Sequence, residues 1–483
     1  MQQHRFSFPT RSSLVLSPAA VGSMLIIYIL LTVGLAFLTG LSPLLALIGA
    51  CGINFTVLLF LRPRLALPFY VLIAGPTLAL PLGSSGILAR LYIGNVLFAL
   101  IVGIWLLRTV SPGHKSGQRP LELRLVVPLV CVIFIGFISI VYWRLFPEPN
   151  VSYSFRHAAD VPITLVNLAE MSLLIGILLL ILIVPSFIRT VRDVQWMIRS
   201  YIGIGLLYAL GTIFAAPLNL YSSSVILGFT RPEVVGLVSG SLGMMLALFS
   251  CMALSQTLYA RRPIVRLWWG ILSFLFALSV VMCFTRDAWI MLFVSVWVII
   301  SARFKNWFVL LIPLVLVLLL SLTPVSDFFD PSKVYGFDRL TMFQDAFNIW
   351  QRHPFLGVGA GNYQFFDIAY GTDVGGVAHS QYLEILAEMG VPGLLCFLWL
   401  VVVMGQTTLK HFNTATSHMG KTLALAYLGF YAGLIALGFF GDPMLPSVAG
   451  AGGTFAFVIV AYPWLIFGLV LSIPNWDKEV SVS

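Results

Sequence analysis

The chain is an almost unbroken series of apolar runs, most of them long enough to cross a lipid bilayer. A transmembrane helix needs about 20 consecutive, mainly apolar residues. Hydrophobic residues make up 59% of the 483 residues and charged residues only 9%, whereas a soluble domain carries roughly a quarter. The sequence therefore predicts an all-α fold, a polytopic transmembrane helical bundle.

About fourteen candidate spans follow one another at short intervals. The run 288–302 is short and the run 65–83 contains prolines, so about twelve spans is the alternative count. Prolines are tolerated where neighbouring helices satisfy the freed carbonyl groups. The candidate spans are 14–39, 41–61, 65–83, 87–107, 125–145, 165–188, 200–216, 234–258, 267–285, 288–302, 307–322, 391–409, 422–441 and 450–472.

Lysine and arginine are unevenly divided between alternate loops, which predicts the orientation in the membrane. With the N-terminus in the cytoplasm, most of the 27 cationic residues fall on the cytoplasmic side and most of the 18 acidic residues on the other. The C-terminus then also lies in the cytoplasm. Because the cations are spread over many loops, we expect a membrane protein with no nucleic-acid partner, despite its net charge of +9.

The sequence gives no indication of a cofactor or a metal centre. The five cysteines all lie in apolar runs without the spacing of metal ligands, so we expect neither a metal site nor disulfides. The run GVGAG lacks a preceding strand and the Lys-Ser/Thr pair of a nucleotide-binding loop. We therefore expect the protein to act without a nucleotide.

One long hydrophilic segment, residues 323–390, interrupts the apolar runs and is predicted on the outer side of the membrane. Long loops in compact architectures usually carry function. The chain is therefore divided into a first transmembrane part, 1–322, this loop, and C-terminal transmembrane helices, 391–483, which together form one membrane domain.

A short amphipathic helix is predicted in the first half of this loop. Its apolar side has four residues at helical spacing, namely Leu340, Phe343, Phe347 and Trp350. Its polar side has four others, Gln344, Asp345, Asn348 and Gln351. Such a helix lies on the outer membrane surface or packs on top of the bundle.

The second half of the loop begins with glycines. Gly357 and Gly359 alternate with Val358 and Ala360 in the run RHPFLGVGAGNY. Glycine allows a tight turn and a close approach of the backbone to a ligand. Gly357 and Gly359 are therefore candidate substrate-binding residues.

His379 stands at the start of the next predicted helix. Three polar residues of this helix share one face, namely Gln381, Glu384 and Glu388. Gly390 and Pro392 are predicted to stop it. The positive end of a helix dipole holds an imidazole towards its neutral form, which can take up a proton. His379 is thus a candidate general base, and a loop histidine with a purely structural role is the alternative.

Three arginines are predicted at the outer face, Arg286 in CFTRDAW, Arg339 after Asp338, and Arg231 in GFTRPEVVG. An arginine near membrane depth is costly unless it is paired or functional. Its planar, permanently charged guanidinium suits the paired oxygens of a phosphate. Three converging arginines would form a diphosphate clamp. The alternatives are an ion pair of Arg286 with Asp287, a solvated helix start at Arg339, and interfacial anchoring by Arg231.

At these residues the sequence resembles the bacterial O-antigen ligase and polysaccharide polymerase superfamily. The resemblance lies in RHPFLGVGAGNY followed by AHSQYLEILAEMGVPG, in CFTRDAW, and in the DRL that precedes the amphipathic helix. It covers roughly residues 230–440. The family usually has asparagine after the histidine, where this chain has Ser380, and its usual span count is nearer twelve.

The resemblance implies a glycosyltransferase in the bacterial inner membrane that acts on the periplasmic face. It would move a glycan from an undecaprenyl-diphosphate carrier to an acceptor hydroxyl, with inversion and without metal or cofactor. Arg286 and Arg339 would hold the diphosphate, and His379 would activate the acceptor hydroxyl. The acceptor, whether lipid A core, a growing glycan or a protein, is left open, as is the oligomeric state.

A flippase for lipid-linked oligosaccharides is the alternative from another functional class. It too would be a large basic helical bundle with arginines that face a lipid diphosphate. Its charged residues would lie in a central cavity, however, whereas here they gather at one predicted membrane face. The long outer loop with its histidine also favours the enzyme.

Overall fold

The computed structural model describes a large part of the chain in two units, Met1–Pro63 and Arg64–Ser483, and the following concerns the second unit. The described residues are 56–57, 59, 61–78, 92–110, 123–151, 163–218, 220–226, 229–304, 339–371, 376–448 and 455–481.

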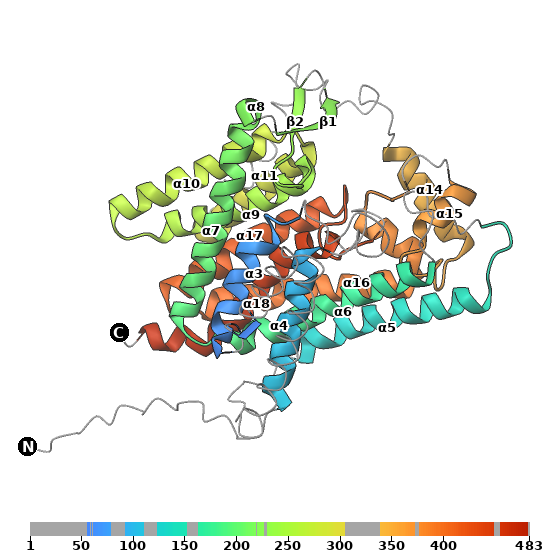
Figure 1. Ribbon diagram of the computed structural model, residues 1–483, viewed down its shortest axis with the longest axis horizontal. Helices are drawn as coiled ribbons and strands as arrows, with labels where there is room; N and C mark the ends of the chain where they lie inside the picture. The colour runs from blue at the N-terminus through green and yellow to red at the C-terminus, as the bar shows by residue number, and fades with distance from the viewer. Residues whose placement is uncertain are drawn as a thin grey trace, which may run out of the picture. The chain divides into compact units, whose positions relative to one another are not determined.

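Ten of the described helices are long and apolar enough to cross a bilayer, which confirms the predicted all-α, multi-pass membrane bundle (Figure 1). They form because only a helix satisfies all its own backbone polar groups within lipid. In chain order they are α4 (Ile93–Val110), α5 (Leu123–Leu145), α6 (Ile163–Phe187), α7 (Val191–Ile213), α9 (Ser239–Tyr259), α10 (Pro263–Met282), α11 (Arg286–Phe304), α16 (Gln381–Thr414), α17 (His418–Leu437) and α18 (Phe455–Ser481).

Shorter elements stand between the spans. They are the 3₁₀ turn η1 (Pro63–Leu65), α3 (Ala66–Ala74), α8 (Ala215–Leu218), strands β1 (Tyr221–Ile226) and β2 (Phe229–Pro232), α14 (Arg339–Arg352) and α15 (Tyr363–Tyr370). The strands form an antiparallel hairpin in which Val225 pairs with Thr230, a feature that the sequence analysis did not predict.

The predicted spans correspond closely to the helices of the described part. The run 65–83 is the exception, because its described residues contain only the short apolar helix of Pro63–Ala74. Spans 14–39 and 307–322, and nearly all of 41–61, lie outside the described residues. The alternative counts of twelve and fourteen spans therefore both stay predictions.

Helix α18 lies at the centre of the bundle, where it packs against α6, α17, α16, α7 and α4. In the membrane-spanning part of α18, 94% of the residues are buried, whereas the share in α10 is 17%. Helix α10 therefore presents most of its surface to the lipid. The side chain of Tyr462 ties α18 to α3, because its hydroxyl accepts a hydrogen bond from the backbone N–H of Gly75 at 3.0 Å. Tyr201 of α7 donates to the carbonyl of Tyr462 at 2.9 Å.

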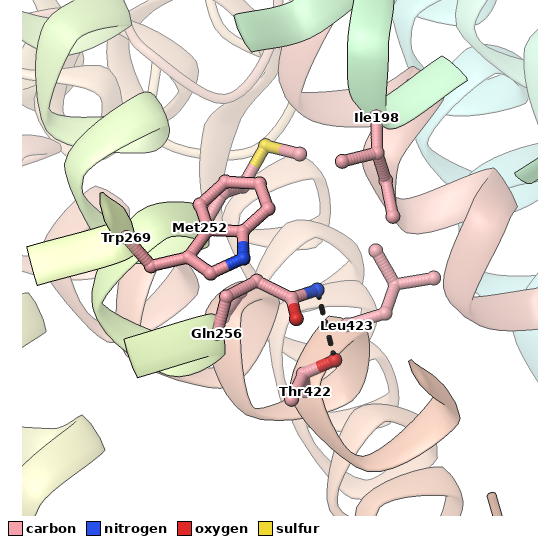
Figure 2. A pocket seen from close by; sticks show the side chains of 7 residues that line it. Ile198, Met252, Gln256, Trp269, Thr422 and Leu423 are labelled. Atoms are coloured by element: carbon pink, nitrogen blue, oxygen red, sulfur yellow. Dashed lines mark hydrogen bonds between the residues drawn. The ribbon is translucent and has the colours of Figure 1, made fainter. Parts of the chain in front are cut away.

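The interior between α7, α9, α10 and α17 is tightly packed. A cavity of about 10 Å³ lies there, lined by Ile198, Met252, Gln256, Trp269, Thr422, Leu423 and Ala426. Figure 2 shows this pocket from close by. Gln256 donates a hydrogen bond of 3.1 Å to the hydroxyl of Thr422 across its edge. A space of this size holds about one water molecule and no glycan.

Candidate functional site

The Gly-rich loop between α14 and α15 packs against the first part of α16. The backbone N–H of Val358 donates to the carbonyl of Ala387 at 2.9 Å, and that of Gly359 donates to the carbonyl of Glu388 at 2.9 Å. Beyond this point the backbone N–H of Val391 donates a hydrogen bond of 3.1 Å to the carbonyl of Pro354. The loop and the helix are therefore joined through their backbones.

Glycine is required on both sides of this junction. Gly357 and Gly359 have φ angles of +65° and +97°, which residues other than glycine rarely adopt. A Cβ atom at Gly357 would overlap the carbonyl carbon of Glu388, and one at Gly390 would overlap the carbonyl of Phe355. The close approach that these glycines permit is thus to the protein's own backbone, and their contact with a substrate stays a prediction.

Gly390 divides α16 into a short first helix and a long second one. Its backbone angles, φ 65° and ψ −167°, are not helical, and the second helix runs on through Pro392 to Thr414. The predicted end of the short helix at Gly390 is therefore confirmed, and the kink there leads directly into the following span. The kink is stabilised by the Gly-rich loop packed against it.

The three polar residues at the start of α16 do share one face, as predicted, but this face is buried. Gln381, Glu384 and Glu388 are 3%, 2% and 4% exposed. Oε1 of Glu388 accepts a bond of 3.1 Å from the N–H of Tyr363, and Oε1 of Glu384 accepts one of 2.7 Å from the hydroxyl of Ser447. These side chains link the loop, α16 and the segment after α17 inside the protein.

Tyr363 lies next to this acidic face. Its hydroxyl is buried and has no hydrogen-bond partner among the described residues. Burial, followed by the charges of Asp367, Glu384, Asp345 and Glu388, raises the pKa of Tyr363 far above its usual value. The hydroxyl therefore stays protonated, and it can serve only as a neutral group there.

Helix α6 supplies two polar residues that the sequence analysis did not identify. Nδ2 of Asn167 donates to the carbonyl of Ala360 at 2.8 Å and to Oδ1 of Asn362 at 2.7 Å. Oε2 of Glu170 accepts a bond of 2.8 Å from the N–H of Val448. The available signal was their presence in an otherwise apolar span, because polar residues at membrane depth are costly and usually have partners.

His379 lies immediately before Ser380, the N-cap residue of α16, and is half-buried. Its φ angle is +47°, an uncommon left-handed conformation for a residue other than glycine. This backbone conformation, rather than a helical one, sets the direction of the imidazole. The predicted place of His379 at a helix start is therefore confirmed, while its role as a base stays a prediction.

Arg286 is the first residue of α11 and follows a similarly unusual turn. Phe284 has a φ angle of +50°, and the hydroxyl of Thr285 donates to the carbonyl of Cys283 at 3.1 Å. The indole N–H of Trp289 donates to the carbonyl of Val281 at 3.1 Å and closes the turn from the other side. The guanidinium is thus attached to a fixed backbone.

Arg231 lies in β2, close to this turn. Burial raises the pKa of the Cys283 thiol to about 12, while the positive charge of Arg231 acts on it in the opposite direction. Such an effect requires the guanidinium to lie within Coulomb range of Cys283, three positions before Arg286. Val235, shortly after Arg231, also has a positive φ, of +52°.

Helix α17 brings the starts of α11 and α16 together. A Cβ atom on Gly433 would lie 2.8 Å from the carbonyl of Met291, and one on Gly429 would lie 2.7 Å from that of Ser295, so α11 and α17 run antiparallel. The start of α11 therefore lies at the C-terminal end of α17. At that same end, the N–H of Gln381 donates to the carbonyls of Gly438 and Gly441 at 2.9 and 3.0 Å.

Arg231, Arg286 and His379 consequently lie at one end of the bundle. Arg339 is the first residue of α14, a separate helix that packs against α16 and α15. The side chain of Arg339 lies outside the part that the structure describes. The convergence of all three on one diphosphate therefore stays a prediction.

The predicted amphipathic helix is present as α14, but its packed face differs from the expected one. Asp345, assigned to the polar side, is only 4% exposed and lies on the face that packs inward, together with Met342, Ala346 and Ile349. Leu340 and Phe347, from the predicted apolar stripe, are exposed. The predicted stripe is therefore only partly exposed, since Phe343 and Trp350 are half-buried.

A second contact holds the outer segments together. Nε2 of His353 lies 2.8 Å from Oε1 of Glu148, which follows α5, and Tyr370 donates a hydrogen bond to the other oxygen of Glu148. Burial first, and then the charge of Arg352, lower the pKa of His353, although Glu148 acts against them. The direction of this shift favours the neutral imidazole at His353.

The described residues contain no group of three or more His, Cys, Asp or Glu side chains arranged to hold a metal ion. The site as described consists instead of cationic and imidazole side chains at the bundle end, above a layer of buried acids. Anion binding at the arginines and proton transfer at the histidine stay predictions.

Comparison with known proteins relates this arrangement to one family. The family model described as O-antigen ligase matches residues 225–398, a range that includes Arg231, Arg286, Arg339, Gly357, Gly359 and His379. No curated protein matches the chain.

One solved structure is described as "Structural coordination of polymerization and crosslinking by a peptidoglycan synthase complex". A chain of that structure is similar to this chain, and the match covers 74% of this chain and 98% of that chain. Its sequence identity is 18% and its TM-score 0.43, so this likeness does not bear on fold or activity. The family match coincides with the motifs whose geometry is described above. Residues 225–398 of this chain are thus similar to the O-antigen ligase family.

Proposed function

We propose that this protein is an inverting, metal-independent glycosyltransferase that moves a glycan from undecaprenyl diphosphate to an acceptor hydroxyl. One observation supports this most: α17 brings Arg286 at the start of α11 to the same end of the bundle as His379 at the start of α16. Arg231 lies close to the turn that carries Arg286. An anion-binding group and a proton acceptor are the two parts that such a transfer needs.

In the proposed reaction, an oxygen of the acceptor attacks the anomeric carbon from the side opposite the diphosphate. The bond from that carbon to the phosphate oxygen breaks, and its electron pair leaves with the lipid diphosphate. Arg286, Arg339 and Arg231 stabilise the charge that develops there. His379 takes the proton of the acceptor hydroxyl, which is worth typically 10²–10⁴-fold in rate for such groups.

The backbone at the proposed site supports a fixed geometry. Among the described residues, three other than glycine have positive φ angles, namely Val235, Phe284 and His379. Each lies in one of the three segments that carry Arg231, Arg286 and the histidine. Non-glycine residues in this conformation are costly and cluster at functional sites, where packing enforces them. We infer that this strain directs the three side chains towards one substrate.

The proposed site lies on the periplasmic face of the inner membrane, with both termini in the cytoplasm. Cysteines placed in 370–376 should then react with impermeant thiol reagents in intact cells, whereas cysteines placed in 112–118 should be shielded. Reversed labelling would put the proposed site in the wrong compartment.

The test of function uses purified protein with a lipid-diphosphate-linked glycan and one acceptor at a time, in the presence of EDTA. His379→Ala should leave binding of the lipid diphosphate near normal, while transfer falls by roughly two to four orders of magnitude. The acceptor that yields product distinguishes a ligase from a polymerase. Movement of the lipid between leaflets without product from any acceptor would instead support a flippase.

A further inference from the structure

The segment 438–448, between α17 and α18, lies along the first turn of α16. The backbone N–H of Gln381 donates to the carbonyls of Gly438 and Gly441 at 2.9 and 3.0 Å. Oε1 of the Gln381 side chain accepts two further backbone N–H groups of the segment, at 3.1 and 3.0 Å. The segment is therefore bound at several points to one residue, which stands two positions after His379.

The same segment brings a second carboxyl group to Glu384. Asp442 directly follows Gly441, whose carbonyl is bound to α16. Farther along, the hydroxyl of Ser447 donates to Oε1 of Glu384 at 2.7 Å. Asp442 thus lies between two points at which the segment contacts this face of α16, and its side chain is within hydrogen-bond distance of the Glu384 side chain. Two carboxyl groups from separate elements meet inside the protein.

One oxygen of each carboxyl group has no donor. Oε2 of Glu384 and Oδ1 of Asp442 are buried, and no described residue donates a hydrogen bond to either. An ionised carboxyl group can only accept hydrogen bonds, so two ionised groups in contact would repel each other. A carboxylic acid has one O–H donor. A single proton on either group therefore turns this contact into a hydrogen bond.

The groups around the pair favour the same state. Among the described residues, the titratable groups that face it are Glu170 of α6, Glu388 of α16 and Tyr363 of α15. Neither member of the pair forms an ion pair with a cation in the described part of the chain. Burial, then the charge and hydrogen bond of Glu384, and then the charge of Glu170, raise the pKa of Asp442 well above its usual range. A second negative charge within the pair would be costly there.

We propose that Glu384 and Asp442 share one proton, and that this carboxyl pair fixes the segment 438–448 to α16 and thereby positions His379. The shared proton joins Glu384, one turn beyond Gln381, to the segment that binds the backbone of Gln381. In this role neither carboxyl group touches the substrate, so both are positioning residues. The shared proton does not depend on the transferase reaction, whereas the effect on His379 rests on the proposed function.

Amide substitutions test the shared proton, because an amide keeps a donor and an acceptor in the pair. Asp442→Asn and Glu384→Gln should each leave the Tm of the purified full-length protein near neutral pH equal or higher. Asp477→Asn is the matched control and should lower the Tm, because Asp477 accepts hydrogen bonds from the backbone N–H and the hydroxyl groups of Thr416 and Ser417. A lower Tm in both amide variants of the pair would show that both groups are ionised or hold a cation, and would overturn the proposal.

The proton also gives the stability a direction of change with pH. In the unfolded chain the pKa values of both groups are about 4, so above that pH the folded protein binds more protons than the unfolded chain. The stability that the shared proton contributes is present at low pH and lost as the pH rises through the raised pKa of the folded state. The fall in Tm with rising pH should therefore be smaller in Asp442→Asn than in the unmodified protein. An equal fall in both proteins would contradict the shared proton.

Transfer kinetics separate positioning from chemistry. Asp442→Asn should keep the transfer rate near normal, whereas Asp442→Ala removes the hydrogen bond and should lower kcat by roughly ten- to a hundredfold with little change in KM for the donor. Loss of transfer in Asp442→Asn at an unchanged Tm would assign Asp442 to the chemistry and overturn the positioning role. If the unmodified protein transfers no glycan, the proposed function fails and the positioning role with it, while the Tm comparison still decides the shared proton.

Discussion

Nδ2 of Asn167 lies 2.7 Å from Oδ1 of Asn362 and 2.8 Å from the carbonyl oxygen of Ala360. One amide on a transmembrane helix therefore holds the Gly-rich loop at the membrane end of the protein. Asn362 in turn donates a hydrogen bond of 2.9 Å to the carbonyl of Val358, so the chain of hydrogen bonds extends into the loop itself. The loop that holds the start of α16 is thus positioned from α6.

The first prediction concerns this amide. Asn167→Ala should lower the free energy of unfolding by about 1–3 kcal/mol, because it leaves the buried acceptors on Ala360 and Asn362 without a donor. Ser172→Ala is the matched control, since that exposed hydroxyl bonds only to Leu168 of its own helix. Thermal unfolding in detergent measures both. Equal stability of the two variants would contradict the role given to Asn167.

The second prediction concerns the junction between the loop and the kink. Gly357→Ala and Gly390→Ala should each destabilise the protein and reduce activity, because the new Cβ atom meets backbone and the positive φ angles disfavour alanine. Gly103→Ala, in open space on α4, should be neutral or stabilising by up to about 1 kcal/mol. Tm and transfer rate are the measurements. Normal activity in Gly390→Ala would show that the kink is dispensable.

The third prediction concerns the arginines of the proposed site. Arg286→Lys and Arg339→Lys should each lose most of the transfer activity, since a point charge does not replace the planar, bidentate guanidinium. Arg231→Lys should lose less. Arg303→Lys is the control, because Arg303 lies at the opposite end of α11, over the ring of Tyr259. Full activity in Arg286→Lys and Arg339→Lys would assign both residues to anchoring or ion pairing.

The fourth prediction concerns pH and the contact between His353 and Glu148. The pKa of His353 is lower in the folded protein than in the unfolded chain, where it is about 6.5, so the unfolded chain binds more protons in the window below that value. The stability that the neutral imidazole contributes is therefore present above about pH 6.5 and lost as the pH falls through the folded value.

His353→Gln removes this titration and provides the comparison. The Tm of the unmodified protein should fall further than that of His353→Gln between about pH 7.5 and about pH 5.5. His418→Gln, at the other end of the bundle, controls for the loss of a histidine as such. If all three proteins respond equally to pH, His353 is not the group whose titration changes the stability.

Most of the membrane architecture could be read from the sequence. Apolar runs of sufficient length become helices in lipid because no water is present to satisfy the backbone, and this constraint acts on each run separately. The family motifs and the common face of Gln381, Glu384 and Glu388 were also local features. The positions of Arg286 and His379 at the starts of helices followed from the same reasoning.

The tertiary structure decided what those residues face. Helical periodicity showed that Glu384 and Glu388 lie on one side of a helix, but only packing against α6 and the segment after α17 makes that side buried. Asp345 was assigned to the exposed side of α14 because a single helix gives no indication that a second surface covers it.

The same limit applies to residues that are far apart in the chain. Asn167 meets Asn362 only after several helices have packed. The sequence by itself therefore determined which segments are helices and which residue types can do chemistry. It also predicted which side of the membrane the motifs occupy. Only the tertiary structure decided their neighbours, because a hydrogen bond or a repulsion depends on distances of a few ångströms that local pattern does not specify.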